Sequence, residues 1–71
     1  MIISHIKTAT GVVTEQVASS LSNLLRDKKD FTVVVDLHTT TVPVEFVGGR
    51  LIKQVEASVI NLIRSELNKL H

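Results

Sequence analysis

The sequence contains no cysteine, tryptophan or tyrosine, and it has one proline and three glycines among its 71 residues. Without cysteine, neither a disulfide nor a thiolate metal site can stabilise the chain. A chain of this length also buries a smaller share of its surface on folding than a larger domain does, so its core leaves little stability to spare. We therefore expect one small α+β domain spanning residues 1–71, stabilised in part by a second subunit.

Charge and hydropathy exclude further classes of protein. Eight lysines and arginines against seven acidic residues give a net charge of +1, which argues against a strongly charged surface for polyanions. A hydrophobic content of 44% argues against disorder. No uninterrupted apolar run exceeds three residues, as in Val33-Val34-Val35, and residues 1–7 lack the pattern of a secretory signal. We expect a cytoplasmic protein without membrane contact.

Alternation of apolar and polar residues predicts a first strand at Ile2–Thr8. Strict alternation would place Ile2, Ser4 and Ile6 on one face of that strand. The other face would carry Ile3, His5 and Lys7.

Two further strands are predicted at Phe31–Leu37 and Thr41–Val47, and they form a hairpin that turns near His38-Thr39-Thr40. Pro43 cannot donate a hydrogen bond to a neighbouring strand, so its nitrogen should face solvent or a bulge. The last strand is therefore a candidate sheet edge.

Apolar residues at helical spacing predict two helices. The first begins with Thr14 as its N-cap and ends at Arg26. The second follows the Gly48-Gly49 break and runs from Arg50 to about Leu70. The order β-α-β-β-α predicts a two-layer α+β sandwich, in which a three-stranded sheet carries both helices on one face. The predicted core consists of Ile6, Val17, Leu21, Leu24, Val33, Val35, Val44, Phe46, Val55, Val59 and Ile63.

Candidates for chemistry are few. Asp36 and His38 leave the same face of a strand, as an acid/base or metal pair would, with Glu45 as the nearest carboxylate on the partner strand. The sequence contains no metal-binding motif, and Gly48-Gly49-Arg50 lacks the spacing of a phosphate-binding loop. We therefore predict a protein that is not an enzyme and that holds no metal or cofactor.

The layout resembles that of the DinI-like family of small bacterial and phage proteins. The resemblance covers the whole chain: an opening strand, a first helix, the hairpin of residues 31–47, the glycine break and a closing helix. It implies a non-enzymatic regulator that binds a RecA-type filament through its last helix. In that family the last helix is strongly acidic, whereas here Lys53, Arg64 and Lys69 outnumber Glu56 and Glu66.

Two functions follow from these features. The first is a protein-interaction or regulatory module that self-associates as a homodimer, or docks on a larger protein partner, through an edge strand or the long C-terminal helix. The apolar stripe of that helix is wider than one small sheet needs. Its predicted interaction residues are Leu51, Val55, Ile60, Ile63 and Leu67. The alternative is weak nucleic-acid binding by cations near the end of the first helix and the start of the second. These cations are Lys7, Arg26, Lys28, Lys29 and Arg50.

Overall fold

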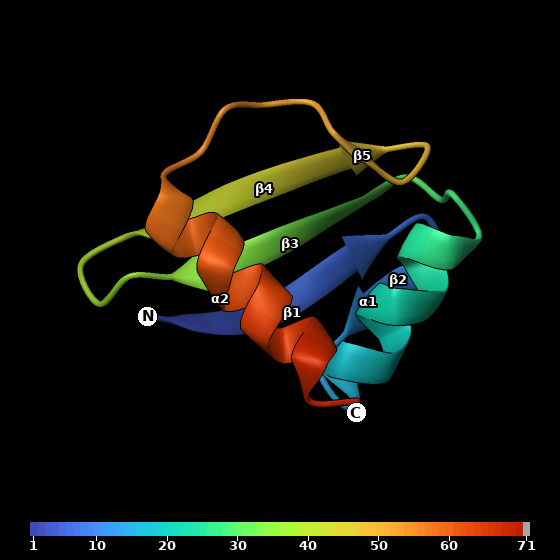
Figure 1. The fold of residues 1–71 in the computed structure, drawn as a ribbon, viewed down its shortest axis with the longest axis horizontal. Helices are drawn as coiled ribbons and strands as arrows, with labels where there is room; N and C mark the ends of the chain where they lie inside the picture. Colours follow the sequence, from blue (N-terminus) through green and yellow to red (C-terminus); the bar gives the residue numbers. More distant parts are fainter. Residues whose placement is uncertain (71) are drawn as a thin grey trace.

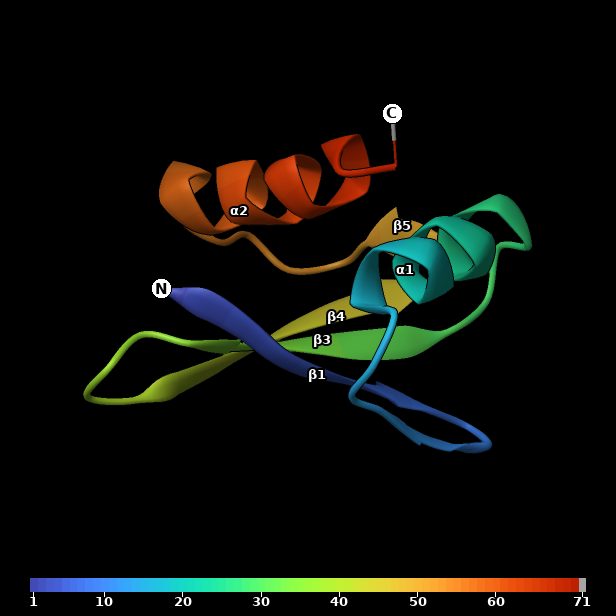
Figure 2. The same cartoon turned by 90° about the horizontal axis from the view of Figure 1, so that it is seen from below.

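The computed structural model describes residues 1–70, which form two layers (Figure 1). One layer is a sheet of five antiparallel strands within this range, and the other consists of two helices on the same side of it (Figure 2). The α+β class is confirmed, whereas the expected number of three strands is wrong. The elements are β1 (Ile2–Thr8), β2 (Gly11–Val13), α1 (Val17–Arg26), β3 (Phe31–Asp36), β4 (Thr41–Val47), β5 (Arg50–Leu51) and α2 (Ala57–Asn68).

The strands lie in the order β2-β1-β3-β4-β5, and each neighbouring pair is antiparallel. Short turns connect β1 to β2, β3 to β4 and β4 to β5, while α1 connects the outer hairpin to β3. β2 and β5 are additions to the predicted layout. With three and two residues, they are too short to show a period in the sequence.

The turn between β4 and β5 corrects the predicted second helix. Gly48 and Gly49 have φ values of +60° and +78°, the positive φ values that a two-residue type I′ hairpin turn requires. The chain therefore reverses into β5 instead of entering a helix at Arg50. Residues 52–56 then follow as an irregular segment, and α2 begins at Ala57. Figure 1 shows this segment passing from β5 around the outer side of β4 to reach α2.

The first helix also begins later than predicted. Val13 lies in β2, where it pairs with Ile6, so the chain is still extended just before Thr14. Gln16 takes a left-handed conformation with φ of 52°, and α1 starts at Val17. Thr14 is therefore not the N-cap, because pairing within the β1–β2 hairpin holds that part of the chain.

A bulge in β1 corrects the predicted faces of the first strand. The register with β3 shifts between Ile3 and His5, which leaves Ser4 as the extra residue. Ile3 opposes Val35 and Ile6 opposes Val33, so both isoleucines point toward the helices. The extra residue inverts the alternation, and the expectation that Ile2, Ser4 and Ile6 share a face is wrong.

The core lies between the sheet and the helices and contains no buried polar side chain within residues 1–70. Phe31 and Phe46, which are paired on β3 and β4, stack with their ring centroids 4.7 Å apart. Eight of the predicted core residues are buried, and Val17, Leu24 and Val55 pack half-buried against them. The buried core cluster is Ile6, Leu21, Phe31, Val33, Val35, Val44, Phe46, Val59 and Ile63.

Candidate interaction surfaces

The residues predicted to form an interaction surface on the last helix do not share one. Leu51 lies in β5 opposite Phe46, and Val55 lies in the segment before α2. Ile63 is buried in the core, and Leu67 packs half-buried against it. Ile60 is half-buried on α2. The apolar stripe of α2 is therefore used largely to cover the sheet, which corrects the expectation of a wide unpartnered stripe.

The outer edge of β4 is interrupted at Pro43, as the sequence predicts. The Glu45 carbonyl accepts a hydrogen bond of 3.2 Å from the Ile52 N–H, so Glu45 directs its backbone groups toward β5. Alternate residues of a strand direct these groups to the same side, so the nitrogen of Pro43 also faces outward. Within the described chain, residues 41–44 have no strand neighbour on that side. Because Pro43 lacks an N–H, this edge is a poor template for a further strand.

The face of the sheet opposite the helices carries a row of side chains that crosses β2, β1, β3 and β4 and ends at the residue after β5, which we call the central row. Strand register places Val12 beside Lys7, Lys7 beside Thr32, and Thr32 beside Glu45. The backbone N–H of Ile52 donates a hydrogen bond to the Glu45 carbonyl, which places Ile52 beside Glu45 at the end of the row. The order along the row is therefore apolar, cationic, hydroxyl, anionic, apolar.

This helix-free face is unusually apolar for a sheet surface in contact with water. Ile2 and Val12 are 62% and 60% exposed, and Val47 and Ile52 are 49% and 53% exposed. Register places Ile2, Val12 and Val47 on this face through their strand partners Asp36, Lys7 and Arg50. The backbone hydrogen bond to Glu45 and a hollow shared with Lys7 and Thr32 place Ile52 there as well. One solvated face of an antiparallel sheet is expected to be mainly polar.

A shallow hollow of about 400 Å³ lies over part of this face. Lys7, Thr32 and Glu45 line it together with Val47 and Ile52. The ion pairs found within residues 1–70 are Arg26–Asp27 and Glu66–Lys69, so neither Lys7 nor Glu45 is neutralised by an ion pair inside the described chain. Both charges are therefore free to meet a partner.

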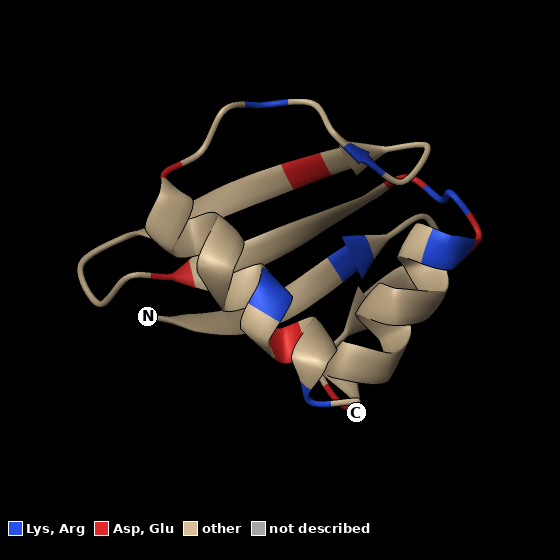
Figure 3. Ribbon diagram, in the orientation of Figure 1, with Lys and Arg blue, Asp and Glu red and all other residues tan. Residues whose placement is uncertain are grey.

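The cations predicted to contact nucleic acid come together at one end of the molecule. The Gly49 N–H donates a 3.2 Å hydrogen bond to the Lys29 carbonyl, and the Gly48 N–H donates a 2.8 Å bond to Oδ1 of Asp30. These bonds join the β4–β5 turn to the loop after α1, and Figure 3 shows basic segments of α1, β1, β5 and this loop at that end. These segments carry Lys7, Arg26, Lys28, Lys29 and Arg50, while Asp27 and Asp30 lie in the same loop and Glu45 lies on the neighbouring β4.

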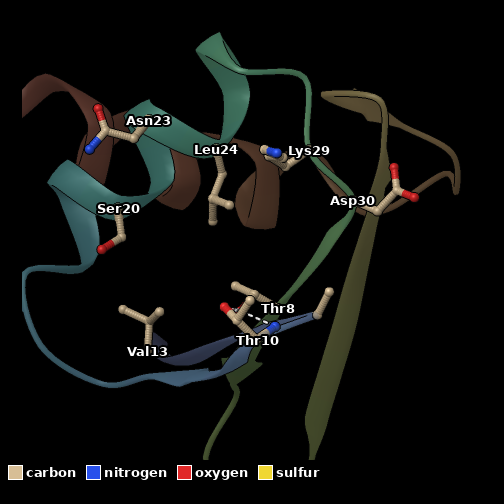
Figure 4. A pocket seen from close by; sticks show the side chains of 9 residues that line it. Thr8, Thr10, Val13, Ser20, Asn23, Leu24, Lys29 and Asp30 are labelled. Carbon is tan, nitrogen blue, oxygen red and sulfur yellow. Dashed lines mark hydrogen bonds between the residues drawn. The ribbon is translucent and has the colours of Figure 1, made fainter.

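A second hollow, of about 520 Å³, lies between α1 and the β1–β2 turn (Figure 4). Leu24 points into it from α1, and Val13 lines the opposite side. The Thr8 hydroxyl is already used locally, because it donates a 2.8 Å hydrogen bond to the Gly11 carbonyl and lies 3.2 Å from the Thr10 hydroxyl. The hollow has the size of a small-molecule site, but its lining provides no nucleophile paired with a base.

The structure separates the residues considered for metal or acid/base chemistry. Oδ1 of Asp36 accepts a 3.0 Å hydrogen bond from the backbone N–H of His38, which makes this carboxylate part of the β3–β4 turn. Glu45 pairs with Thr32 toward the other end of β4, whereas Asp36 pairs with Thr41. Within residues 1–70, no group of three or more histidines, cysteines and acidic residues is placed to hold a metal ion.

Comparison of the chain with protein-family models, with curated proteins and with solved structures finds no match in any of the three. Neither helix of the described part of the chain is long and apolar enough to cross a membrane.

Proposed function

We propose that this protein is a small, cytoplasmic, non-enzymatic interaction module that binds another protein through the helix-free face of its sheet. The observation that carries the proposal is the exposure of Ile2, Val12, Val47 and Ile52 on that one face. Burying such side chains against a partner is favourable because apolar surface leaves water. The accessible surface of 4847 Å² also exceeds the roughly 4,400 Å² expected for a monomer of this mass.

The shapes of the sheet edges favour the face over an edge as the binding surface. Pro43 removes a donor from the outer edge of β4, and the bulge at Ser4 interrupts β1 where β2 does not cover it. Native sheets use prolines and bulges at edges to prevent strand addition. α2 is a weaker candidate because its apolar residues pack on the core.

Photo-crosslinking tests this proposal without assuming the partner. A photo-reactive residue is placed at position 12 or position 52 in the cells that naturally produce the protein. The matched control is position 70, because Leu70 is a similarly exposed apolar residue that follows α2. We expect protein adducts from positions 12 and 52 and none from position 70. Adducts from position 70 alone, or from none of the three positions, would contradict the proposal.

Nucleic-acid binding is a second candidate, and the gathering of five cations at one end of the molecule favours it. The three interspersed acids predict weak binding. Fluorescence anisotropy with labelled single-stranded and duplex oligonucleotides tests it, because contacts to phosphates weaken steeply as salt rises. Lys28→Glu should reduce binding, while Lys53→Glu, outside the cluster, should not. An absence of binding at low salt would exclude this candidate.

The RecA-type filament implied by the DinI-like resemblance remains a prediction. Photo-crosslinking of the purified protein to such a filament, with the photo-reactive residue at exposed position 64 of α2, tests it directly. An adduct through α2 would support that partner, since the resemblance assigns binding to the last helix.

A further inference from the structure

We propose that the partner of the helix-free face is a second copy of this chain, related by a two-fold axis that runs along β3 over Thr32. This inference rests on the surface assigned in the proposed function and specifies its occupant. In a two-fold dimer the same patch serves both copies, so the patch must be complementary to itself. The central row meets that condition.

The positions along the central row supply the complementarity. Thr32 lies on the middle strand, with Lys7 one strand away on one side and Glu45 one strand away on the other. Neighbouring strands are about 4.8 Å apart, so the two charged residues lie about equal distances from Thr32. A two-fold axis along β3 exchanges the two sides. Lys7 of each copy then faces Glu45 of the other copy, which forms two opposite-charge contacts.

The ends of the row match in the same way. Val12 lies two strands from Thr32 on the side of Lys7, and Ile52 lies two positions away on the side of Glu45. The same axis places Val12 of each copy against Ile52 of the other copy. Apolar side chains therefore flank both charge pairs and exclude water from them, which strengthens the electrostatic attraction.

The next row on this face agrees with the same axis. Val34 lies at its centre on β3, between His5 on β1 and Pro43 on β4. The axis therefore places Val34 against its own counterpart, and His5 against Pro43. Asp36 also lies on β3, about 13 Å from Thr32 along the strand. Packed sheets cross at about 30°, so the axis bisects this angle and is inclined by about 15° to each β3. The two copies of Asp36 then separate to about one Debye length.

Charge also selects the direction of the axis. A two-fold axis perpendicular to the strands, in the plane of the interface, would not exchange the two sides of the row. Lys7 of one copy would then face Lys7 of the other, and Glu45 would face Glu45. Like charges placed opposite each other across an interface are disfavoured. The axis along β3 is therefore the face-to-face arrangement that the charges of the central row favour.

The size of the face predicts a weak dimer. Five strands at about 4.8 Å spacing and seven residues at about 3.4 Å give a face of about 19 Å by 24 Å. The two copies together would then bury about 900 Å², below the 1,200 Å² at which specific stable interfaces begin. We expect a dissociation constant in the micromolar range or weaker, so the experiment needs protein at hundreds of micromolar.

Charge reversal measured by sedimentation velocity tests the two-fold arrangement. Lys7→Glu alone and Glu45→Lys alone each replace two attractive contacts by two repulsive ones, and each should weaken dimerisation about tenfold or more. An equimolar mixture of the two variants should associate as a heterodimer, because each cation again faces an anion. The double variant Lys7→Glu/Glu45→Lys should also dimerise. Arg64→Glu, an exposed change on α2, is the control and should leave dimerisation unchanged.

The outcomes separate this inference from the proposed function. A wild-type protein that stays monomeric at these concentrations overturns the two-fold dimer, while adducts to another protein from position 12 or 52 would still support the interaction face. Single variants that dimerise as well as the wild type also overturn it, as does a mixture that stays monomeric. Weakening in both single variants together with recovery in the double variant supports it, because positions 7 and 45 attract in the double variant only if they meet across copies.

Discussion

Replacement of Gly49 by alanine tests the contact that holds the β4–β5 turn against the end of α1. A Cβ atom added at Gly49 would lie 3.0 Å from the Leu25 carbonyl oxygen and 3.2 Å from the Lys28 Cα. Both contacts are with backbone, which cannot rotate away as a flexible side chain could. At Gly48 a Cβ would meet nothing within 4 Å, although this residue also has positive φ.

The comparison of the two glycines separates conformational strain from crowding. A left-handed conformation costs an alanine about 1 kcal/mol more than a glycine, so Gly48→Ala should lower the free energy of unfolding by about that amount. Gly49→Ala carries the same strain, and overpacking adds about 1–3 kcal/mol because the turn must move away from α1. The expected loss for Gly49→Ala is therefore about 2–4 kcal/mol.

Urea denaturation followed by circular dichroism measures both free energies of unfolding. Near the melting temperature, each kcal/mol should correspond to about 4–8 °C in a domain of this size, so a thermal scan provides an independent reading. Equal losses for Gly48→Ala and Gly49→Ala would refute the close approach of the turn to α1. The proximity of the five cations at that end would then lose its structural basis as well.

Three further substitutions test other parts of the structure. Leu21→Ala removes a fully buried side chain and should lower the free energy of unfolding by about 2–5 kcal/mol in urea, and a loss below 1 kcal/mol would contradict its place in the core. His38→Gly relieves a φ of 79° and should raise the free energy of unfolding by about 0.5–1 kcal/mol, whereas a loss would show that the side chain contributes to the turn. Pro43→Thr restores an N–H on the outer edge of β4, so light scattering should rise with concentration more steeply than for the wild-type protein, and unchanged scattering would contradict the role assigned to this edge.

The longer elements could be predicted from the sequence because their own residues define them. In β3 and β4, apolar side chains alternate over six and seven residues, and the pairs Val33–Val44 and Phe31–Phe46 place both apolar sets on the helix side. β2 and β5 could not be predicted in this way. Each is a strand only because a neighbour pairs with it.

The error in the second helix has a specific cause. Leu51 and Val55 fall at helical spacing with the apolar residues of α2, so they extend its apparent stripe toward the N-terminus. The signal against this interpretation was the Gly48-Gly49 pair, which is typical of a two-residue hairpin turn as well as of a strand-to-helix connection. In the structure Leu51 pairs with Phe46 across that turn.

The sequence indicated the group of five cations but gave no indication of the central row. The grouping of the five cations stays a prediction, because it was expected from Arg50 at the start of a helix and Arg50 lies on β5 instead. The central row was not foreseen, because Lys7, Thr32 and Glu45 come from three separate strands. Their alignment depends on the strand order and on the extra residue at Ser4, which shifts the register of β1. Neither feature leaves a periodic signal in the sequence.

The strand order also has a consequence for the folding pathway of the chain. Three of the four neighbouring strand pairs in the described sheet close across short turns, and such hairpins form within about 1–10 μs. The pairing of β1 with β3 instead closes a loop that contains β2 and α1, residues 9–30. The entropy cost of closing this longer loop is offset only when apolar contacts across the pair, such as that of Ile6 with Val33, form. The pairing of the β1–β2 hairpin with strands β3 to β5 therefore has the largest loop-closure cost among the strand pairings of the described sheet.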